Sequence, residues 1–92
     1  MINMNFRLNS TEFLKAIAWC MENGFEGELF PCFDGLQYCY PREEGKEFDF
    51  ICHSGSYGGN EGLLEILSNK MDDVVGYLTA EELIDLIIQL YK

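Results

Sequence analysis

Basic side chains are scarce in this sequence of 92 residues: 6 Lys plus Arg stand against 16 Asp plus Glu, which gives a formal net charge of -10. A surface of this charge repels phosphate backbones and anionic lipid headgroups. The deficit therefore argues against direct binding to nucleic acid or to a membrane surface. A basic protein surface is the partner that such a chain attracts, although an acidic exterior can also serve solubility alone.

Long apolar runs are also missing, and no segment reaches the length of about 20 apolar residues that a membrane-spanning helix needs. Residues 1–10 (MINMNFRLNS) have neither a basic start nor a long apolar stretch before a small-residue cleavage site. We therefore expect a cytoplasmic protein. In a reducing compartment its cysteines are most simply small buried hydrophobic residues: Cys20, Cys32, Cys39 and Cys52.

Residues suited to catalysis are few, and histidine is limited to His53, which directly follows Cys52. Neighbouring residues of a regular strand point to opposite faces, so these two cannot act together as nucleophile and base. The sequence contains no CxxC or HxxxH spacing, which does not favour a zinc site. Carboxylates are plentiful but are expected in loops and on helix surfaces, away from an apolar pocket. We therefore predict no enzymatic activity, no metal site and no cofactor.

The centre of the chain, residues 28–53, predicts three antiparallel strands. Asp34-Gly35 separates two aromatic-rich runs, and Asp-Gly favours a two-residue type I′ turn because both central positions need positive φ. Closing the chain there pairs Phe33 with Leu36. Residues 46–53 alternate between apolar and polar side chains, as a half-buried strand does.

Further strands are expected on either side of this centre. Apolar and polar side chains alternate weakly over residues 1–8, which could extend the sheet. Residues 63–67 are a short apolar run that fits a strand or a short helix, and we favour a strand. Residues 74–78 are predicted to form a last short strand. Pro31 cannot donate to a strand ladder, which favours an edge position for its strand. The glycine-rich residues 54–62 match no phosphate-binding spacing and contain no Lys or Arg, so they predict a long mobile hairpin loop with Tyr57 at its tip.

A helix is predicted over residues 10–23, between an Asn9/Glu12 capping pair and Gly24. One face of this helix is apolar and should pack on the sheet; it carries Phe13, Leu14, Ile17, Cys20 and Met21. Trp19 projects from the polar side. Either a loop or the amino-terminal segment covers its indole, or the ring is an aromatic anchor in a protein interface.

A second helix is predicted over residues 80–92, starting at the capping box Thr79-Ala-Glu-Glu82. Its polar side chains fill one narrow sector, and apolar ones fill more than half of its circumference: Leu83, Ile84, Leu86, Ile87, Ile88, Leu90 and Tyr91. A stripe of this width is buried on two sides of the helix or packs on a second copy of the chain. The fold class that follows is α+β: one domain over residues 1–92, with a small antiparallel meander flanked by an amino-terminal and a carboxyl-terminal helix.

Two short stretches, SYGGNEGLLEI at residues 56–66 and DDVVGYLTAEEL at residues 72–83, resemble small proteins of unknown function encoded by bacteriophages and prophages. The resemblance implies a bacterial host cell and a virus-derived origin, and it carries no catalytic motif. A recurring role among small acidic phage proteins is to block a host defence or nucleic-acid enzyme by occupying its basic groove, which makes an anti-CRISPR-like inhibitor the expectation by analogy.

We therefore expect a non-enzymatic inhibitor that binds the basic surface of a host nucleic-acid-binding protein or complex through carboxylates. The expected binding residues are those around the second hairpin loop and those beside the tryptophan: Glu43, Glu44, Glu47, Asp49, Trp19, Glu22, Glu26 and Glu28. The alternative is a homodimeric structural or accessory phage protein, joined through the carboxyl-terminal helix, whose acidic surface is only a solvated exterior.

Overall fold

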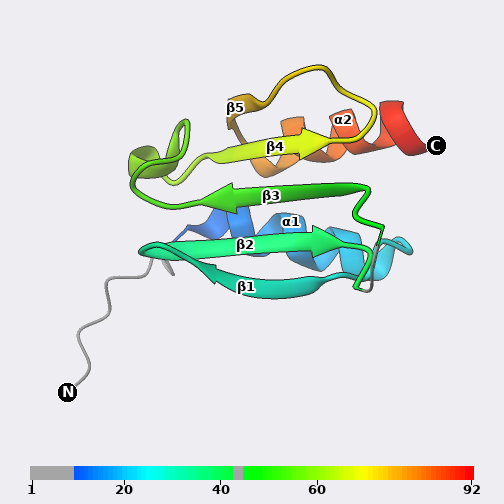
Figure 1. Cartoon of the computed structure of the whole chain (residues 1–92), viewed down its shortest axis with the longest axis horizontal. Coiled ribbons are helices and arrows are strands. Elements are labelled where there is room, and N and C mark those ends of the chain that lie inside the picture. The colour runs from blue at the N-terminus through cyan, green and yellow to red at the C-terminus, as the bar shows by residue number, and fades with distance from the viewer. Residues whose placement is uncertain (1–9, 43–44) are drawn as a thin grey trace.

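The structure, a computed structural model, describes residues 10–42 and 45–92 and has the predicted α+β architecture (Figure 1). Five antiparallel strands pair in chain order as a meander, with a helix before the first strand and another after the last. The elements are α1 Thr11–Glu22, β1 Glu28–Cys32, β2 Gly35–Tyr40, β3 Phe48–Cys52, the 3-10 helix η1 Gly59–Glu61, β4 Leu64–Ser68, β5 Val75–Leu78 and α2 Ala80–Tyr91. The strand expected over residues 1–8 lies outside the described residues.

Both helices lie on the same face of the sheet and run in the same direction, behind the strands in Figure 1. The core fills the space between these two layers, because alternate side chains of the central strands are buried there and the intervening ones are not. Its largest fully buried side chains are Tyr38, Phe13, Phe48, Phe50, Leu64, Ile66, Leu83 and Ile87. In the described part of the chain the fold is therefore a two-layer arrangement, in which the helices cover one face of the sheet and no element covers the other.

The first hairpin turns one residue earlier than predicted. Cys32 pairs with Gly35 and Pro31 with Leu36, so the two-residue turn is Phe33-Asp34 and the register differs by two residues from the expected one. Gly35 belongs to β2 instead, because a Cβ at that position would lie 1.9 Å from the carbonyl oxygen of Cys52. Pro31 lies in β1, which is an edge strand as predicted.

The strands predicted near residues 63–67 and 74–78 are confirmed as β4 and β5. The glycine-rich segment between β3 and β4 is folded closely on itself and against β5. Ser56 and Gly59 are buried, and the Tyr77 amide donates to the Tyr57 carbonyl oxygen at 3.1 Å. A Cβ on Gly76 would lie 2.2 Å from Cβ of Tyr57, so glycine permits this close approach.

Helix α1 begins at Thr11, one residue later than predicted. Ser10 is the N-cap, and its hydroxyl oxygen accepts a hydrogen bond of 3.1 Å from the Phe13 amide, so the prediction of Asn9 as the cap is wrong. The carboxyl-terminal stop is confirmed: Gly24 has φ +89°, and the Phe25 amide donates to the Cys20 carbonyl oxygen at 2.8 Å.

The buried face of α1 is rotated from the predicted one. Phe13, Ala16 and Cys20 are buried, whereas Leu14 and Met21 are each 54% exposed. The rotation follows from a second neighbour that helical periodicity does not reveal, because α1 packs against α2 as well as on the sheet. A helix that contacts two partners buries a stripe between them.

Helix α2 has the predicted capping box: the Glu82 amide donates to Thr79 Oγ1 at 3.2 Å, and the Thr79 amide donates to Glu82 Oε1 at 2.9 Å. The helix contacts β4, β5 and α1. Its apolar stripe is therefore buried on two sides within one chain, and of the large apolar side chains of α2 only Ile88 is classed as exposed, at 39%. The width of the stripe needs no second copy to account for it. Neither described helix is long and apolar enough to cross a membrane.

Candidate functional site

One face of the sheet has no neighbouring layer among residues 10–42 and 45–92. Because both helices pack on the other side, alternate residues of four strands face outward here (Figure 1). The strand register arranges them in two rows across the sheet, one of Phe30, Gln37, Ile51 and Glu65 and one of Glu28, Cys39, Asp49 and Leu67. We call these eight residues the open face. Apolar side chains, with Cys39 counted among them, alternate with polar or acidic ones in both rows.

Three carboxylates belong to the open face, and two of them have defined partners. Asp49 accepts a hydrogen bond of 2.9 Å from Nε2 of Gln37 and lies 3.4 Å from Nζ of Lys46. Glu65 accepts a hydrogen bond of 2.7 Å from the Tyr57 amide. Glu28 is exposed on the edge strand. The face thus combines fixed negative charge with apolar area, a composition suited to contact with a basic protein surface.

The thiols on this side of the sheet are not activated. Burial raises the pKa of the Cys39 thiol, and the nearby Asp49 carboxylate adds to the rise. Burial likewise raises the pKa of the Cys32 thiol, and the charges of Asp49 and Glu65 add to it. Both cysteines are free, and they remain protonated at neutral pH. A thiol in this state is a weak nucleophile and a poor metal ligand.

The predicted binding residues do not form one group. Asp49 and Glu28 belong to the open face, whereas Glu22 is an exposed residue of α1 in the layer behind the sheet. Glu26, in the link between α1 and β1, pairs with Arg42 at 3.3 Å. The predicted residues Glu43 and Glu44 lie outside the described residues.

Glu47, next to β3, has a structural setting. Its side chain accepts a hydrogen bond of 3.3 Å from Asn69, and its carbonyl oxygen accepts one of 2.8 Å from the Tyr91 hydroxyl. These bonds tie the start of β3 to the end of α2. The residue is half-buried, so only part of it is available to a partner.

Trp19 is half-buried at the margin of the core. Its indole stacks on the Phe25 ring with 5.7 Å between centroids and 17° between planes, and Nζ of Lys92 lies 5.9 Å from its centroid. Phe25, which follows the helix, therefore covers part of the ring. Of the two interpretations of Trp19, this packing favours the covered indole over the interface anchor.

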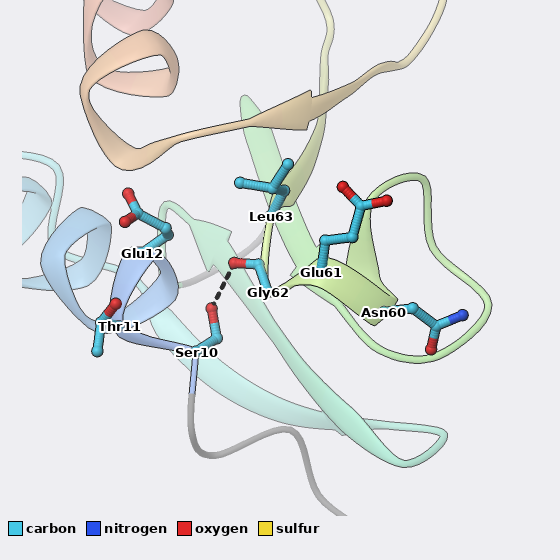
Figure 2. Close-up of a pocket in the computed structure, with 7 residues that line it drawn as sticks. All are labelled: Ser10, Thr11, Glu12, Asn60, Glu61, Gly62 and Leu63. Carbon is cyan, nitrogen blue, oxygen red and sulfur yellow. Dashed lines mark hydrogen bonds between the residues drawn. The ribbon is translucent and has the colours of Figure 1, made fainter.

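A polar hollow of about 350 Å³ lies where α1 begins beside η1 (Figure 2). Ser10 is fully engaged here, because its hydroxyl donates to the Gly62 carbonyl oxygen at 2.9 Å while accepting from the Phe13 amide. Glu12 is also engaged, since its carboxylate accepts a hydrogen bond from the first amide of α2. These groups stabilise the junction of two helices and a loop, and no further role is assigned to them.

Cys52 is the last residue of β3, His53 follows the strand, and their side chains have different surroundings. The Cys52 side chain is buried in the core, whereas His53 accepts a hydrogen bond of 2.9 Å from the Gly55 amide through Nδ1. Within residues 10–42 and 45–92, no three or more His, Cys, Asp or Glu side chains cluster closely enough to hold a metal ion.

The open face also contains residues that the sequence prediction did not assign to binding, among them Ile51, Glu65 and Leu67. Strand alternation could have grouped them with Asp49, because all four share one side of the central strands. The alternation of side chains does not show that both helices cover the opposite face of the sheet.

Comparison with known proteins yields no relatives: no family model, no curated protein and no solved structure matches the chain. The resemblance to phage-encoded proteins therefore stays a prediction.

Proposed function

We propose that the chain is a non-enzymatic protein that binds and inhibits a host defence or nucleic-acid-handling protein, such as a CRISPR effector, through its acidic surface. The observation that supports this function is the open face, where Glu28, Asp49 and Glu65 lie among apolar side chains on the side of the sheet that no described element covers. A net charge of -10 adds a long-range attraction to basic partners.

The alternation of the open face supports a protein partner in particular. Phe30 and Leu67 are 40% and 41% exposed, so their burial on binding would add hydrophobic stabilisation to the charge contacts. Carboxylates chiefly raise the association rate and the selectivity for a basic partner, whereas apolar contacts slow dissociation. The partner that fits is a protein surface rich in Lys and Arg that also offers apolar area.

The experiment is a binding assay with purified CRISPR effectors and other basic nucleic-acid enzymes, at low and at high salt, followed by an activity assay of each enzyme that binds. The test variant is Glu28→Lys on the open face, and the matched control is Asp85→Lys, an equal charge change at an exposed position of α2. We expect Glu28→Lys to slow association several-fold and Asp85→Lys to have a smaller effect. Equal effects, or binding that is insensitive to salt, would contradict the proposed function.

A further inference from the structure

Phe33 holds a conformation that its side chain disfavours. It is the first of the two residues that turn the chain from β1 to β2, and its φ is 55°. This is the left-handed region, where a Cβ crowds the backbone and glycine is the usual residue. A bulky side chain there is a genuine outlier, and outliers of this kind concentrate at functional sites.

Burial does not explain why an aromatic residue stands in this turn. The Phe33 side chain is 86% exposed, the most exposed of the large apolar side chains named as exposed in the described part of the chain. The fold thus accepts a strained backbone and also leaves a large apolar ring in water. A surface that binds a partner accounts for both features, since exposed aromatic side chains are typical anchors of protein interfaces.

The ring is supported from one side. The centroids of the Phe33 and His53 rings are 4.9 Å apart at an interplanar angle of 44°, and His53 is itself only 8% exposed. Gly35 lies between the two residues, and a Cβ there would come within 2.8 Å of Cα of His53. A hollow of about 400 Å³ opens beside the rings, lined by Phe33, His53, Ser54 and Gly55.

A carboxylate lies beside this hollow. Asp34, the second residue of the turn, accepts a hydrogen bond of 2.9 Å from the Ser54 amide, which holds its carboxylate beside the hollow. A cation that enters the hollow therefore meets aromatic rings and has a carboxylate beside it.

We propose that the hollow beside Phe33 and His53 binds an arginine side chain of the basic partner, with the guanidinium stacked on the Phe33 ring and facing Asp34. This inference rests on the proposed function and specifies the group that the chain recognises. Arginine fits better than lysine because its planar guanidinium stacks on aromatic faces and pairs with carboxylates through several donors, whereas an ammonium is a compact, strongly hydrated charge.

The test compares two peptides of equal charge, acetylated and amidated hexa-arginine and hexa-lysine, at one fixed low ionic strength. Each is titrated into the isotopically labelled chain, and affinity and amide chemical shifts are measured by NMR. We expect hexa-arginine to bind roughly two- to fivefold more tightly, the range that cation–π stacking at an exposed site provides. We also expect the largest shifts at Phe33, Asp34, Ser54 and Gly55.

Three substitutions separate the ring from the backbone strain. Phe33→Ala and Phe33→Gly should both abolish the preference for arginine, whereas Phe33→Tyr should retain it. Phe33→Gly should also keep or raise the melting temperature, because glycine relieves the disfavoured φ. Leu14→Ala, which removes an exposed apolar side chain of helix α1 outside the open face, is the matched control and should leave the preference unchanged.

The outcomes distinguish this inference from the proposed function. Equal binding of both peptides, or a preference for arginine that survives Phe33→Ala, would overturn the arginine site while leaving a carboxylate-based binder intact. Shifts confined to Glu22 and Glu26 would do the same and would move the binding surface to the helix layer. If neither peptide binds at low ionic strength, the chain does not attract basic groups, and both proposals fail.

Discussion

The carboxylate of Glu12 accepts a hydrogen bond of 2.7 Å from the backbone amide of Ala80, across 68 residues of sequence. Glu12 lies in the first turn of α1, and Ala80 is the first residue of α2. The two helices run in the same direction, so their amino termini and the positive ends of their dipoles come together. One carboxylate therefore neutralises two helix starts and fixes how the helices pack.

Replacing Glu12 by alanine should lower the free energy of unfolding by about 1–2 kcal/mol, because the Ala80 amide loses a charged acceptor in a partly buried position. Glu12→Gln keeps an acceptor and should cost about half as much. Urea unfolding followed by circular dichroism measures both. The control is Glu22→Ala on the exposed side of the same helix, expected within about 0.5 kcal/mol of the parent. Equal losses of stability in Glu12→Ala and Glu22→Ala would show that the hydrogen bond between Glu12 and Ala80 does not stabilise the fold.

Gly35→Ala should unfold the protein or destabilise it by about 3 kcal/mol or more, because the new methyl group would overlap the carbonyl group of Cys52 in the neighbouring strand. Both groups are backbone-bound and cannot move aside cheaply. Thermal unfolding measures the effect. Gly45→Ala is the comparison, since nothing lies within 4 Å of a Cβ there and only its φ of +86° disfavours alanine, at a cost of about 1–2 kcal/mol. Similar losses of stability in Gly35→Ala and Gly45→Ala would show that β2 and β3 move apart to accommodate the methyl group at position 35.

Gly35 also shows where sequence patterns stop being sufficient. The Asp34-Gly35 dipeptide correctly indicated a hairpin, because a short turn does join two strands there. The same glycine could serve a turn or a close approach between strands, and only the neighbouring strand decides between these uses. Local signals therefore predicted that the elements exist, including the capping box of α2, but not the register between β1 and β2.

The same limit applies to the candidate site. Alternation predicted which residues of β3 share a face, so Asp49 was separated correctly from Phe48 and Phe50. It did not predict that both helices cover the same face of the sheet (Figure 1), which is the face where Phe48 and Phe50 are buried and Asp49 is not. Likewise, Trp19 belongs with polar residues by helical periodicity, yet Phe25 beyond the helix end covers it. Tertiary packing decides which side of β3 is covered and whether Trp19 is covered, and the periodicity of the sequence does not predict that packing.

The stability of the fold should fall at alkaline pH because of Cys20. This side chain is fully buried, and burial raises the pKa of its thiol from 9.0 to about 12. Below pH 9 the thiol is protonated in both the folded and the unfolded chain, so its contribution is complete there. Above pH 9 the unfolded chain releases the proton and the folded chain does not. The free energy of unfolding should therefore fall by up to about 1.4 kcal/mol per pH unit from this group between pH 9 and 12.

Urea unfolding between pH 7.5 and 10.5, for the parent and for Cys20→Ala, isolates this contribution. The alanine variant should be less stable at pH 7.5, because it leaves a small cavity, but its stability should decline less steeply above pH 9. Burial also raises the pKa of the Tyr38 hydroxyl, which adds a decline of the same sign in both proteins, and the charge of Cys20 adds to that rise in the parent alone. Parallel pH profiles for the two proteins would mean that the Cys20 thiol ionises as easily in the folded chain as in the unfolded one, which is incompatible with its burial between α1 and the sheet.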